Sequence, residues 1–397
     1  MNICGIVCEY NPFHNGHLFH IEETRRRGAD AIICIMSGNY VQRADFAIMQ
    51  KNARAKAAVL SGADLVIELP LPWAIASAER FAFGAVSILN SLGVVSSLSF
   101  GAENENTEEL STIAEALLSD EFEETIMKEL ESGISYATAR EKTLLKIIGD
   151  SSKLIATPNN ILAVEYIKAL KKLGSHISPI AISRKGAEHD SFSTDGNIAS
   201  ATLIRDLILK EDNYSSYLPS QSLEVFKKEV FLGHAPVSIK DADRAILARL
   251  KTMTVEDFKT VCDVSEGLEN RLADAVSASA TLSDAIESAK TKRYAHSRIR
   301  RIFLNAFLGI SSDFATSTPP YARILAFNDT GRMIIKDAKK KSTIPIITKT
   351  ASVKEESEKA QRLLTLEKNA DDIYSLFMKS PISQGNTFTQ MPFYAEK

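Results

Sequence analysis

Glu9-Tyr10-Asn11-Pro12-Phe13-His14-Asn15-Gly16-His17 is the stretch around which this chain is organised. The eight residues before it, MNICGIVC, are apolar and partly β-branched, which predicts a buried strand. From Leu18 to Arg27 the pattern is helical, and the glycine that follows is a common helix-ending residue. The stretch therefore joins a strand to a helix. In an open α/β sheet, ligands bind at such crossings, outside the carboxyl ends of the strands.

Two histidines flank a glycine at this crossing, in the order His14-Asn15-Gly16-His17. A glycine lets a phosphate approach the backbone, and the N–H groups at a helix start attract anions. Two imidazoles add donors for the charge that develops on a transferring phosphoryl group. The alternative is a pair of histidines that only cap an ordinary strand–helix turn. Strand, motif and helix together resemble the HxGH signature of the nucleotidyltransferase superfamily, which includes class I aminoacyl-tRNA synthetases and small adenylyltransferases.

Length and composition describe an ordinary globular chain. Its 397 residues predict two or three domains, and 45% hydrophobic with 24% charged residues is typical of a protein with a sizeable core. A formal net charge of -3 excludes a global basic field, so any RNA contact must come from local patches. The four cysteines form no CxxC pair, and we expect reduced thiols in a cytoplasmic protein. We expect no signal peptide and no membrane span, because a charged leader and a long apolar run are both missing.

Four further apolar runs predict strands, at residues 30–36, 64–69, 94–100 and 177–183. Repeated strand–helix units are typical of a parallel, doubly wound sheet. We therefore predict an α/β fold, a Rossmann-like doubly wound parallel sheet followed by a mostly helical C-terminal domain. Residues 1–215 form the predicted catalytic domain, with a Glu-rich helical insertion at about 105–150, and residues 216–397 form the helical domain.

Several polar residues follow the predicted strands and would face a ligand. Arg43 lies in the loop after the second strand, either as a ligand for phosphate or carboxylate or as a solvated loop arginine. Asn159 and Asn160 open a predicted helix, and they are either extra helix caps or ligand contacts. Arg184 and Lys185 follow the fifth strand, either as a phosphate clamp or as solvated charges.

A second helix start is predicted at Ser200-Ala201-Thr202-Leu203-Ile204-Arg205, where Ser200 or Thr202 would be the N-cap. Arg205 lies one turn into this helix, on the side of its start. The segment is similar to an SxTxIR motif of the same superfamily, the counterpart of the mobile lysine loop of the synthetases. Two phosphate-binding helix starts, one near each end of the predicted catalytic domain, would hold a triphosphate between them.

The helical half contains a basic segment near the start of a predicted helix. Its cations are Lys290, Lys292, Arg293, Arg298, Arg300 and Arg301. Cations oppose the dipole at a helix start unless an anion offsets them, which favours contact with an RNA backbone. The alternative is a solvated basic face, and a second run, Lys336 with 339–341, is typical of such a face.

Together these motifs resemble the family of tRNA(Met) cytidine acetate ligases, bacterial enzymes that acetylate the wobble cytidine of elongator methionine tRNA. The resemblance covers nearly the whole chain. It rests on residues 5–7, 9–17, 37–43, 62–70, 100–103, 158–162 and 267–272, with a looser match at 344–349.

The resemblance implies a reaction in two steps. ATP and acetate first form acetyl-adenylate and pyrophosphate, and the exocyclic amine of the cytidine then attacks the acyl carbon and releases AMP. The first step depends on a tightly bound triphosphate, a carboxylate aligned for in-line attack and charge stabilisation. It depends less on covalent catalysis by the protein. Mg²⁺ would bind to the phosphates of ATP, and the protein would supply no metal-binding cage of its own.

The resemblance also implies which residues bind ATP. His14 and His17 would be the catalytic pair at the phosphates, and Gly16 would allow close approach. Gly101 and Asn160 would hold the nucleoside, and the cations and hydroxyls beyond residue 183 would hold phosphate. The complete predicted site is Ile6, Val7, Glu9, Asn11, Phe13, His14, Gly16, His17, His20, Gly101, Asn159, Asn160, Arg184, Lys185, Ser200, Thr202 and Arg205.

Two other functions stay open at this point. A small-molecule adenylyltransferase acting on a phosphorylated metabolite is disfavoured by the large helical half, which such enzymes usually lack. A non-catalytic nucleotide-binding or RNA-binding module would tolerate the loss of His17. For the ligase, the expected partners are elongator tRNA(Met) and acetate, without a membrane, and the oligomeric state is left open.

Overall fold

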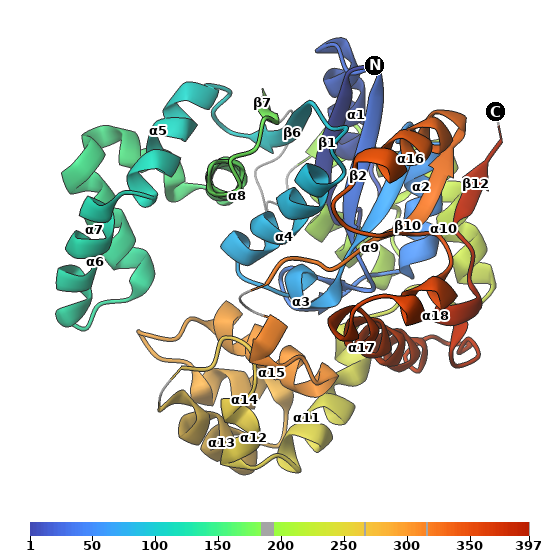
Figure 1. Ribbon diagram of the computed structural model, residues 1–397. Helices are drawn as coiled ribbons and strands as arrows, with labels where there is room; N and C mark the ends of the chain where they lie inside the picture. Colours follow the sequence, from blue (N-terminus) through green and yellow to red (C-terminus); the bar gives the residue numbers. More distant parts are fainter. Residues whose placement is uncertain (184–193, 266, 315–316, 397) are drawn as a thin grey trace.

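An eight-stranded sheet runs through the computed structural model, which describes residues 1–183, 194–265, 267–314 and 317–396 (Figure 1). Seven strands follow one another in the order β11-β10-β5-β2-β1-β6-β7, and β12 pairs with β10. The strands are β1 (Ile3–Cys8), β2 (Ala31–Ser37), β5 (Leu65–Leu69), β6 (Ser97–Ala102), β7 (Ser178–Ser183), β10 (Ala322–Asn328), β11 (Ile346–Ile347) and β12 (Phe393–Ala395).

The five strands predicted from the sequence lie side by side and parallel, in the order β5-β2-β1-β6-β7. Cys4 of β1 pairs with Ile32 of β2 on one side and with Ser97 of β6 on the other. The order of these strands along the chain reverses beside β1, so β1 and β6 flank a topological switch point. The predicted α/β fold with a doubly wound parallel core is confirmed. The switch point places the expected ligand site at the carboxyl ends of β1 and β6.

Helices cover both faces of the sheet, which explains why its central strands are continuous apolar runs. Along β2, Ile33 and Ile35 face one apolar core and Ile32 and Cys34 face another. The first core includes side chains of α4 (Ala78–Ser91), α8 (Pro158–Lys172) and α16 (Asp329–Lys341). The second includes side chains of α1 (Asn15–Arg26), α2 (Lys51–Leu60), α9 (Ala201–Leu209) and α10 (Ser220–Phe231).

The predicted insertion is a group of three helices that projects from one edge of the molecule (Figure 1). They are α5 (Thr107–Leu117), α6 (Asp120–Glu131) and α7 (Tyr136–Ile148). Contacts between α5 and α8 attach this group to the sheet, and its apolar side chains, such as Phe122 and Leu144, extend the first core.

A separate helical unit lies against the carboxyl-end side of the sheet (Figure 1). It comprises α11 (Asp243–Lys251), α12 (Val255–Lys259), α13 (Leu268–Ala278), α14 (Leu282–Ala289) and α15 (His296–Leu308). Its core reaches Tyr40 and Phe46 on the small hairpin of β3 (Tyr40–Val41) and β4 (Asp45–Phe46). Tyr374 of α17 (Glu358–Ser375) belongs to the same core. This packing joins the helical unit to the loops that follow β2.

The end of the chain returns to the sheet, where the sequence analysis had only the looser family match at 344–349, which resembles a strand near the family's C-terminus. β10 pairs antiparallel with β5, and β11 and β12 pair with β10. Arg323 interrupts the apolar pattern of β10, so the segment does not read as a buried strand. In the structure Arg323 is buried, and its guanidinium lies 3.3 Å from the carboxylate of Glu68 on β5. Among the described helices, none is long and apolar enough to cross a membrane.

Candidate functional site

A large cavity opens at the carboxyl ends of β1 and β6, as the strand order predicts. Its volume is about 740 Å³, within the range of small-molecule sites. Most of the predicted ATP-binding residues line it: Ile6, Val7, Glu9, Asn11, His14, Gly16, His17, His20, Gly101, Asn159, Ser200, Thr202 and Arg205.

His14 and His17 cap the start of α1 in a reciprocal arrangement. His14 is the N-cap, and its Nδ1 accepts a hydrogen bond from the backbone N–H of Gly16 at 3.1 Å. The Nδ1 of His17 accepts a hydrogen bond from the backbone N–H of His14 at 3.2 Å. The two rings are stacked, with centroids 3.6 Å apart. The histidines are therefore helix caps, as one alternative proposed, and they line the cavity as well.

The capping hydrogen bonds assign the protonation of both rings. A neutral imidazole has one donor and one acceptor nitrogen, and Nδ1 is the acceptor in His14 and in His17. The hydrogen of each neutral ring is therefore on Nε2. Protonation of both stacked rings would bring like charges together and would remove the two caps. The pair is thus built to donate hydrogen bonds from Nε2, as a site for anionic oxygen requires.

Neighbouring residues fix the position of this pair. A Cβ on Gly16 would lie 3.0 Å from the Cε1 atom of the His14 ring, so the glycine makes room for that ring against the backbone. One turn further along α1, Nε2 of His20 lies 2.9 Å from the hydroxyl of Ser99 on β6. The Ser99 hydroxyl is also 2.8 Å from the hydroxyl of Thr24. These polar contacts hold α1 against the strand on the far side of the switch point.

The second predicted helix start opens into the same cavity. Ser200 is the N-cap of α9, and its hydroxyl accepts a hydrogen bond from the N–H of Leu203. Arg205 donates from Nη1 to the carbonyl oxygen of Asn11 at 3.0 Å, and its Nη2 lies 3.3 Å from the hydroxyl of Thr202. The start of α9 is therefore tied to the segment that leads into the histidine pair.

Asn15 makes a second link between the two helix starts. Its side-chain amide donates to the carbonyl oxygen of Asn197 at 2.7 Å and to that of Ser216 at 2.9 Å. Asn197 directly precedes β9 (Ile198–Ala199), which leads into α9. Two polar connections thus bring the two anion-attracting helix starts to one place.

Two of the predicted residues lie elsewhere. Phe13 is fully buried in the core beneath the motif, with its ring 4.7 Å from that of Tyr10, and it does not line the cavity. Asn160 serves the connection between β6 and α8. Its side-chain oxygen accepts from the N–H groups of Glu103 and Asn104, and its own N–H donates to Glu103. Asn160 is therefore a structural clasp at the start of α8.

Glu103 completes that clasp by accepting hydrogen bonds from several groups at the start of α8. Its carboxylate accepts from the hydroxyl of Thr157 at 2.7 Å and from the side chain of Asn159. A carboxylate at a helix start is favoured by the dipole. Asn159 differs from Asn160 because it also lines the cavity. Arg184 and Lys185, the predicted phosphate clamp, lie outside the described residues.

The sequence analysis missed part of the cavity wall. Phe81, Phe100 and Tyr166 form an apolar side, and nothing in their spacing distinguishes them from ordinary core residues. Gln42 and Arg43, from the loop between β3 and β4, line it as well. The location of Arg43 agrees with its interpretation as a ligand-facing residue.

The start of α15 also lines the cavity, through His296, Ser297, Arg300 and Arg301. The sequence analysis identified this basic segment and favoured contact with RNA over a solvated face, but nothing in the sequence places it beside the histidine pair. The structure thus connects the helical unit directly with the switch point of the sheet.

Several of these arginines have partners within the protein. Arg298 donates to the carbonyl oxygen of Asp263 at 2.8 Å, and Arg301 lies 3.5 Å from the Asp263 carboxylate. Arg300 is 3.1 Å from the carboxylate of Asp45 on β4. Lys292 and Arg293, in contrast, are exposed. The basic segment therefore divides into residues with partners inside the protein, of which Arg300 links the helical unit to β4, and residues that face solvent.

Arg54 is a buried residue that links the carboxyl ends of β1 and β2. Its guanidinium is fully buried and donates to the backbone oxygens of Glu9, Ser37, Gly38 and Met49. Four carbonyl acceptors satisfy a buried guanidinium that would otherwise be strongly destabilising. The segment that follows β1 is thereby fixed relative to the one that follows β2.

Cys8 lines the cavity but is not suited to nucleophilic chemistry. Burial, together with the neighbouring Cys34, raises the pKa of the Cys8 thiol well above its ordinary value. Because the thiolate is the nucleophilic form of cysteine, this thiol stays protonated and unreactive near neutral pH. The cavity therefore favours catalysis by binding and charge stabilisation.

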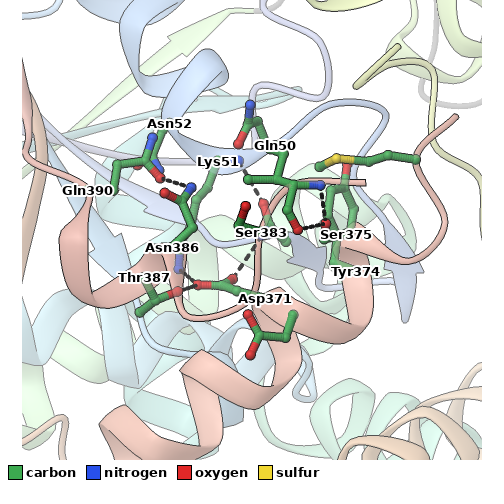
Figure 2. Close-up of a pocket in the computed structure, with 14 residues that line it drawn as sticks. Gln50, Lys51, Asn52, Asp371, Tyr374, Ser375, Ser383, Asn386, Thr387 and Gln390 are labelled. Carbon is green, nitrogen blue, oxygen red and sulfur yellow. Dashed lines mark hydrogen bonds and ion pairs between the residues drawn. The ribbon is translucent and has the colours of Figure 1, made fainter. Parts of the chain in front are cut away.

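A second pocket lies between the start of α2 and the segment of α17 and α18 (Asn386–Thr389) (Figure 2). Its volume is about 30 Å³, room for a single water molecule. Lys51 lies 2.7 Å from the carboxylate of Asp371, which also accepts from the hydroxyl of Thr387. This pocket is a polar joint between sheet and C-terminal helices. In the described part of the chain, no group of three or more His, Cys, Asp or Glu side chains is placed to hold a metal ion.

Comparisons with known proteins agree over nearly the whole length. Residues 1–388 match the family described as HIGH Nucleotidyl Transferase. The chain is 39% identical to the tRNA(Met) cytidine acetate ligase of Acetivibrio thermocellus, over 98% of this chain and 99% of that protein. It is 40% identical to the protein of the same name from Caldanaerobacter subterraneus subsp. tengcongensis, over 96% of each chain.

Solved structures give the same result. The apo crystal structure of Thermotoga maritima TmcAL superposes with a TM-score of 0.96, covers 100% of both chains and is 32% identical. A second crystal structure of that protein, bound with alpha-thio ATP, superposes with a TM-score of 0.93 over 100% of both chains.

Proposed function

The chain belongs to the HIGH nucleotidyltransferases and, within them, to the tRNA(Met) cytidine acetate ligases, and we propose that its large cavity carries out both steps of their reaction. It is an ATP-dependent ligase. In the first step acetate and ATP give acetyl-adenylate and pyrophosphate. In the second, the N4 amine of the wobble cytidine of elongator tRNA(Met) takes the acetyl group and AMP leaves.

The observation that carries this proposal is the meeting of two helix starts in one cavity. His14 and His17 line it from α1, and Ser200, Thr202 and Arg205 line it from α9. Helix starts bind anions through free N–H groups and the helix dipole. The negative charge of a triphosphate held between them would be contacted by hydrogen-bond donors from both helix starts. This is the requirement for adenylate formation, in which positioning and charge stabilisation do most of the work.

The donor set fits ATP. In the neutral form of each motif histidine the capping contacts assign the hydrogen to Nε2, and the Arg205 guanidinium adds a charged donor. Gly101, inside β6 at the other side of the switch point, lines the cavity without a side chain and suits the approach of a nucleoside. Mg²⁺ would enter with the phosphates of ATP, because this small, hard cation favours phosphate oxygens and keeps several of its waters.

The acceptor tRNA would approach from the side of the helical unit. The start of α15 lines the cavity, and the exposed Lys292 and Arg293 lie just before that start. Exposed cations next to the reaction site supply the phosphate contacts that position RNA. In this division, residues 1–215 supply most of the site that activates acetate, and the helical unit of α11–α15 within residues 216–397 binds tRNA. Both substrates of the second step are cytoplasmic, so we place the protein in the cytoplasm.

The decisive experiment separates this ligase from the two alternatives. The purified protein is incubated with ATP, Mg²⁺, labelled acetate and total tRNA, and the tRNA is digested to nucleosides. The proposal predicts N4-acetylcytidine in the elongator tRNA(Met) fraction and acetate-dependent exchange of pyrophosphate into ATP. A binding module would give neither product. A small-molecule adenylyltransferase would leave both acetate and tRNA unmodified, which would overturn the proposal.

A further inference from the structure

The second step raises a question of proton transfer. The N4 amine of cytidine is conjugated with its ring and is only weakly basic. When its nitrogen bonds to the acyl carbon it has to lose a hydrogen, and a positioned base with a suitable pKa accelerates such a step. The cavity therefore needs a group that accepts a proton near the acyl carbon.

The histidines of α1 do not meet this need. Nδ1 of His14 and of His17 accepts a backbone N–H, so the remaining nitrogen of each neutral ring already carries a hydrogen. Nε2 of His20 lies against the Ser99 hydroxyl at 2.9 Å. These rings donate to anions or hold α1 in place. Among the residues that the structure describes, Glu9 is the one carboxylate that lines the cavity.

Glu9 is fixed in position on two sides. It follows β1 directly, and its carbonyl oxygen accepts a hydrogen bond from the buried Arg54. Its Oε1 atom accepts the backbone N–H of Gln42 at 2.8 Å. Among the described residues, no other hydrogen bond reaches the Glu9 carboxylate. Its Oε2 atom can therefore act on a substrate. A carboxylate is also ill suited to bind phosphates, since the two charges repel.

We propose that Glu9 is the proton acceptor for acetyl transfer, an inference that rests on the function proposed above. The N4 nitrogen of the cytidine forms a bond to the acyl carbon of acetyl-adenylate. One N–H proton passes to the Glu9 carboxylate as the bond between the acyl carbon and the phosphate oxygen breaks. AMP leaves with the electron pair of that bond, and Glu9 returns its proton to solvent. Atoms and charge balance without a further reactant.

The test separates the two steps. For wild type and Glu9→Gln, adenylate formation is measured as acetate-dependent pyrophosphate exchange without tRNA. Transfer is measured as a single turnover of preformed acetyl-adenylate with elongator tRNA(Met). General-base catalysis is worth about 10² to 10⁴ in rate, so transfer in Glu9→Gln should fall by at least about 10². The fall in transfer should exceed any fall in exchange at least about tenfold. Glu105→Gln, a half-exposed carboxylate just beyond β6 and outside the cavity, is the matched control and should match wild type in both assays.

A conservative variant excludes a merely structural effect. Glu9→Asp keeps the charge and should recover part of the transfer rate, which also serves if Glu9→Gln does not fold. Transfer at the wild-type rate in Glu9→Gln would overturn the inference and assign the proton to the departing phosphate. Absence of exchange in wild type would instead contradict the proposed function itself.

Discussion

Arg205 donates a hydrogen bond from Nη1 to the carbonyl oxygen of Asn11 across 3.0 Å, although the two residues are 194 positions apart in the chain. This bond joins the start of α9 to the segment that carries the histidine pair. The same guanidinium lines the cavity. Arg205 therefore has two roles in the proposed site, to hold the two helix starts together and to face the triphosphate.

Substitution of Arg205 should weaken both roles. Lysine keeps the charge but lacks the planar fork that contacts Asn11 and Thr202 together. We expect Arg205→Lys to raise the KM for ATP and to lower kcat for pyrophosphate exchange by about 10-fold to 100-fold. Lys210→Gln removes an exposed cation that follows the same helix and pairs only with Asp206 in the described structure. That control should keep wild-type kinetics, and equal losses in both variants would contradict the assignment.

The histidine pair can be separated into cap and donor by one substitution. Asparagine is a good N-cap, so His14→Asn keeps the helix start while it removes the Nε2 donor. We expect acetate-dependent exchange to fall by about 10² to 10³, the typical loss for one charge-stabilising donor, with little change in thermal stability. His14→Ala should lose the same activity and, in addition, about 1 kcal/mol of stability. Full exchange activity in His14→Asn would mean that His14 is only a cap.

The basic segment before α15 predicts a salt effect on tRNA binding. Lys292 and Arg293 are exposed, whereas Arg298 is held by Asp263. For Lys292→Gln with Arg293→Gln we expect weaker tRNA binding and a slope of log K against log salt that is shallower by about 1 to 2. The double variant Lys339→Gln with Lys340→Gln removes two exposed lysines of α16 and should leave the slope unchanged. Identical slopes for wild type and both variants would mean that the segment is a solvated basic face that does not bind tRNA.

Glu367 predicts how stability changes with pH. Burial, and secondarily the charge of Glu68, raises the pKa of its carboxyl group from 4.5 to about 7. Below about pH 4.5 the carboxyl group is protonated in the folded and the unfolded chain, so it adds no pH dependence to the free energy of unfolding. As pH rises toward 7 the unfolded chain releases the proton and the folded one keeps it, so stability falls, by up to about 3 kcal/mol.

Glu367→Gln should remove this decline, because the amide has no proton to release. In wild type the Tyr321 hydroxyl lies 2.7 Å from the Glu367 carboxylate, and the amide oxygen of glutamine can still accept that hydrogen bond. The measurement is urea unfolding at pH 5 and pH 8, and the variant should gain stability relative to wild type at the higher pH. Glu115→Gln, a largely exposed carboxylate on α5, is the control. A constant difference between variant and wild type across the two pH values would contradict the shifted pKa.

The sequence predicts the sheet core well because its strands are buried on both faces. The β-branched runs that include Ile33 and Ile67 are typical of strands buried on both faces, and repeated strand–helix units indicate parallel pairing, although they do not give the strand order. β10 was not predicted, because Arg323 masks the apolar pattern and its partner Glu68 lies 255 residues earlier. Such a pairing is visible only once the sheet is assembled.

The site shows the same division. Residues adjacent to His14 in sequence, and the start of α9, were predicted from local helix-capping patterns. Phe13 and Asn160, which were predicted to bind ATP, do not line the cavity, since local sequence does not reveal on which side of a turn a side chain lies. His296 was not predicted, because its distance from the switch point depends on how the helical unit packs.

The antiparallel pairing of β10 with β5 has a consequence for how the chain is made. A nascent chain that has left the ribosome only as far as residue 215 contains every strand of the parallel core, but the outer edge of β5 is still bare. Bare edges recruit other chains, and Glu68, which pairs with Lys51 at 2.6 Å, still lacks its second cation, Arg323. We therefore expect a fragment that ends at residue 215 to expose this edge and to associate with other chains. The final form of the edge is set only when residues 322–328 arrive, late in synthesis, after the whole helical unit.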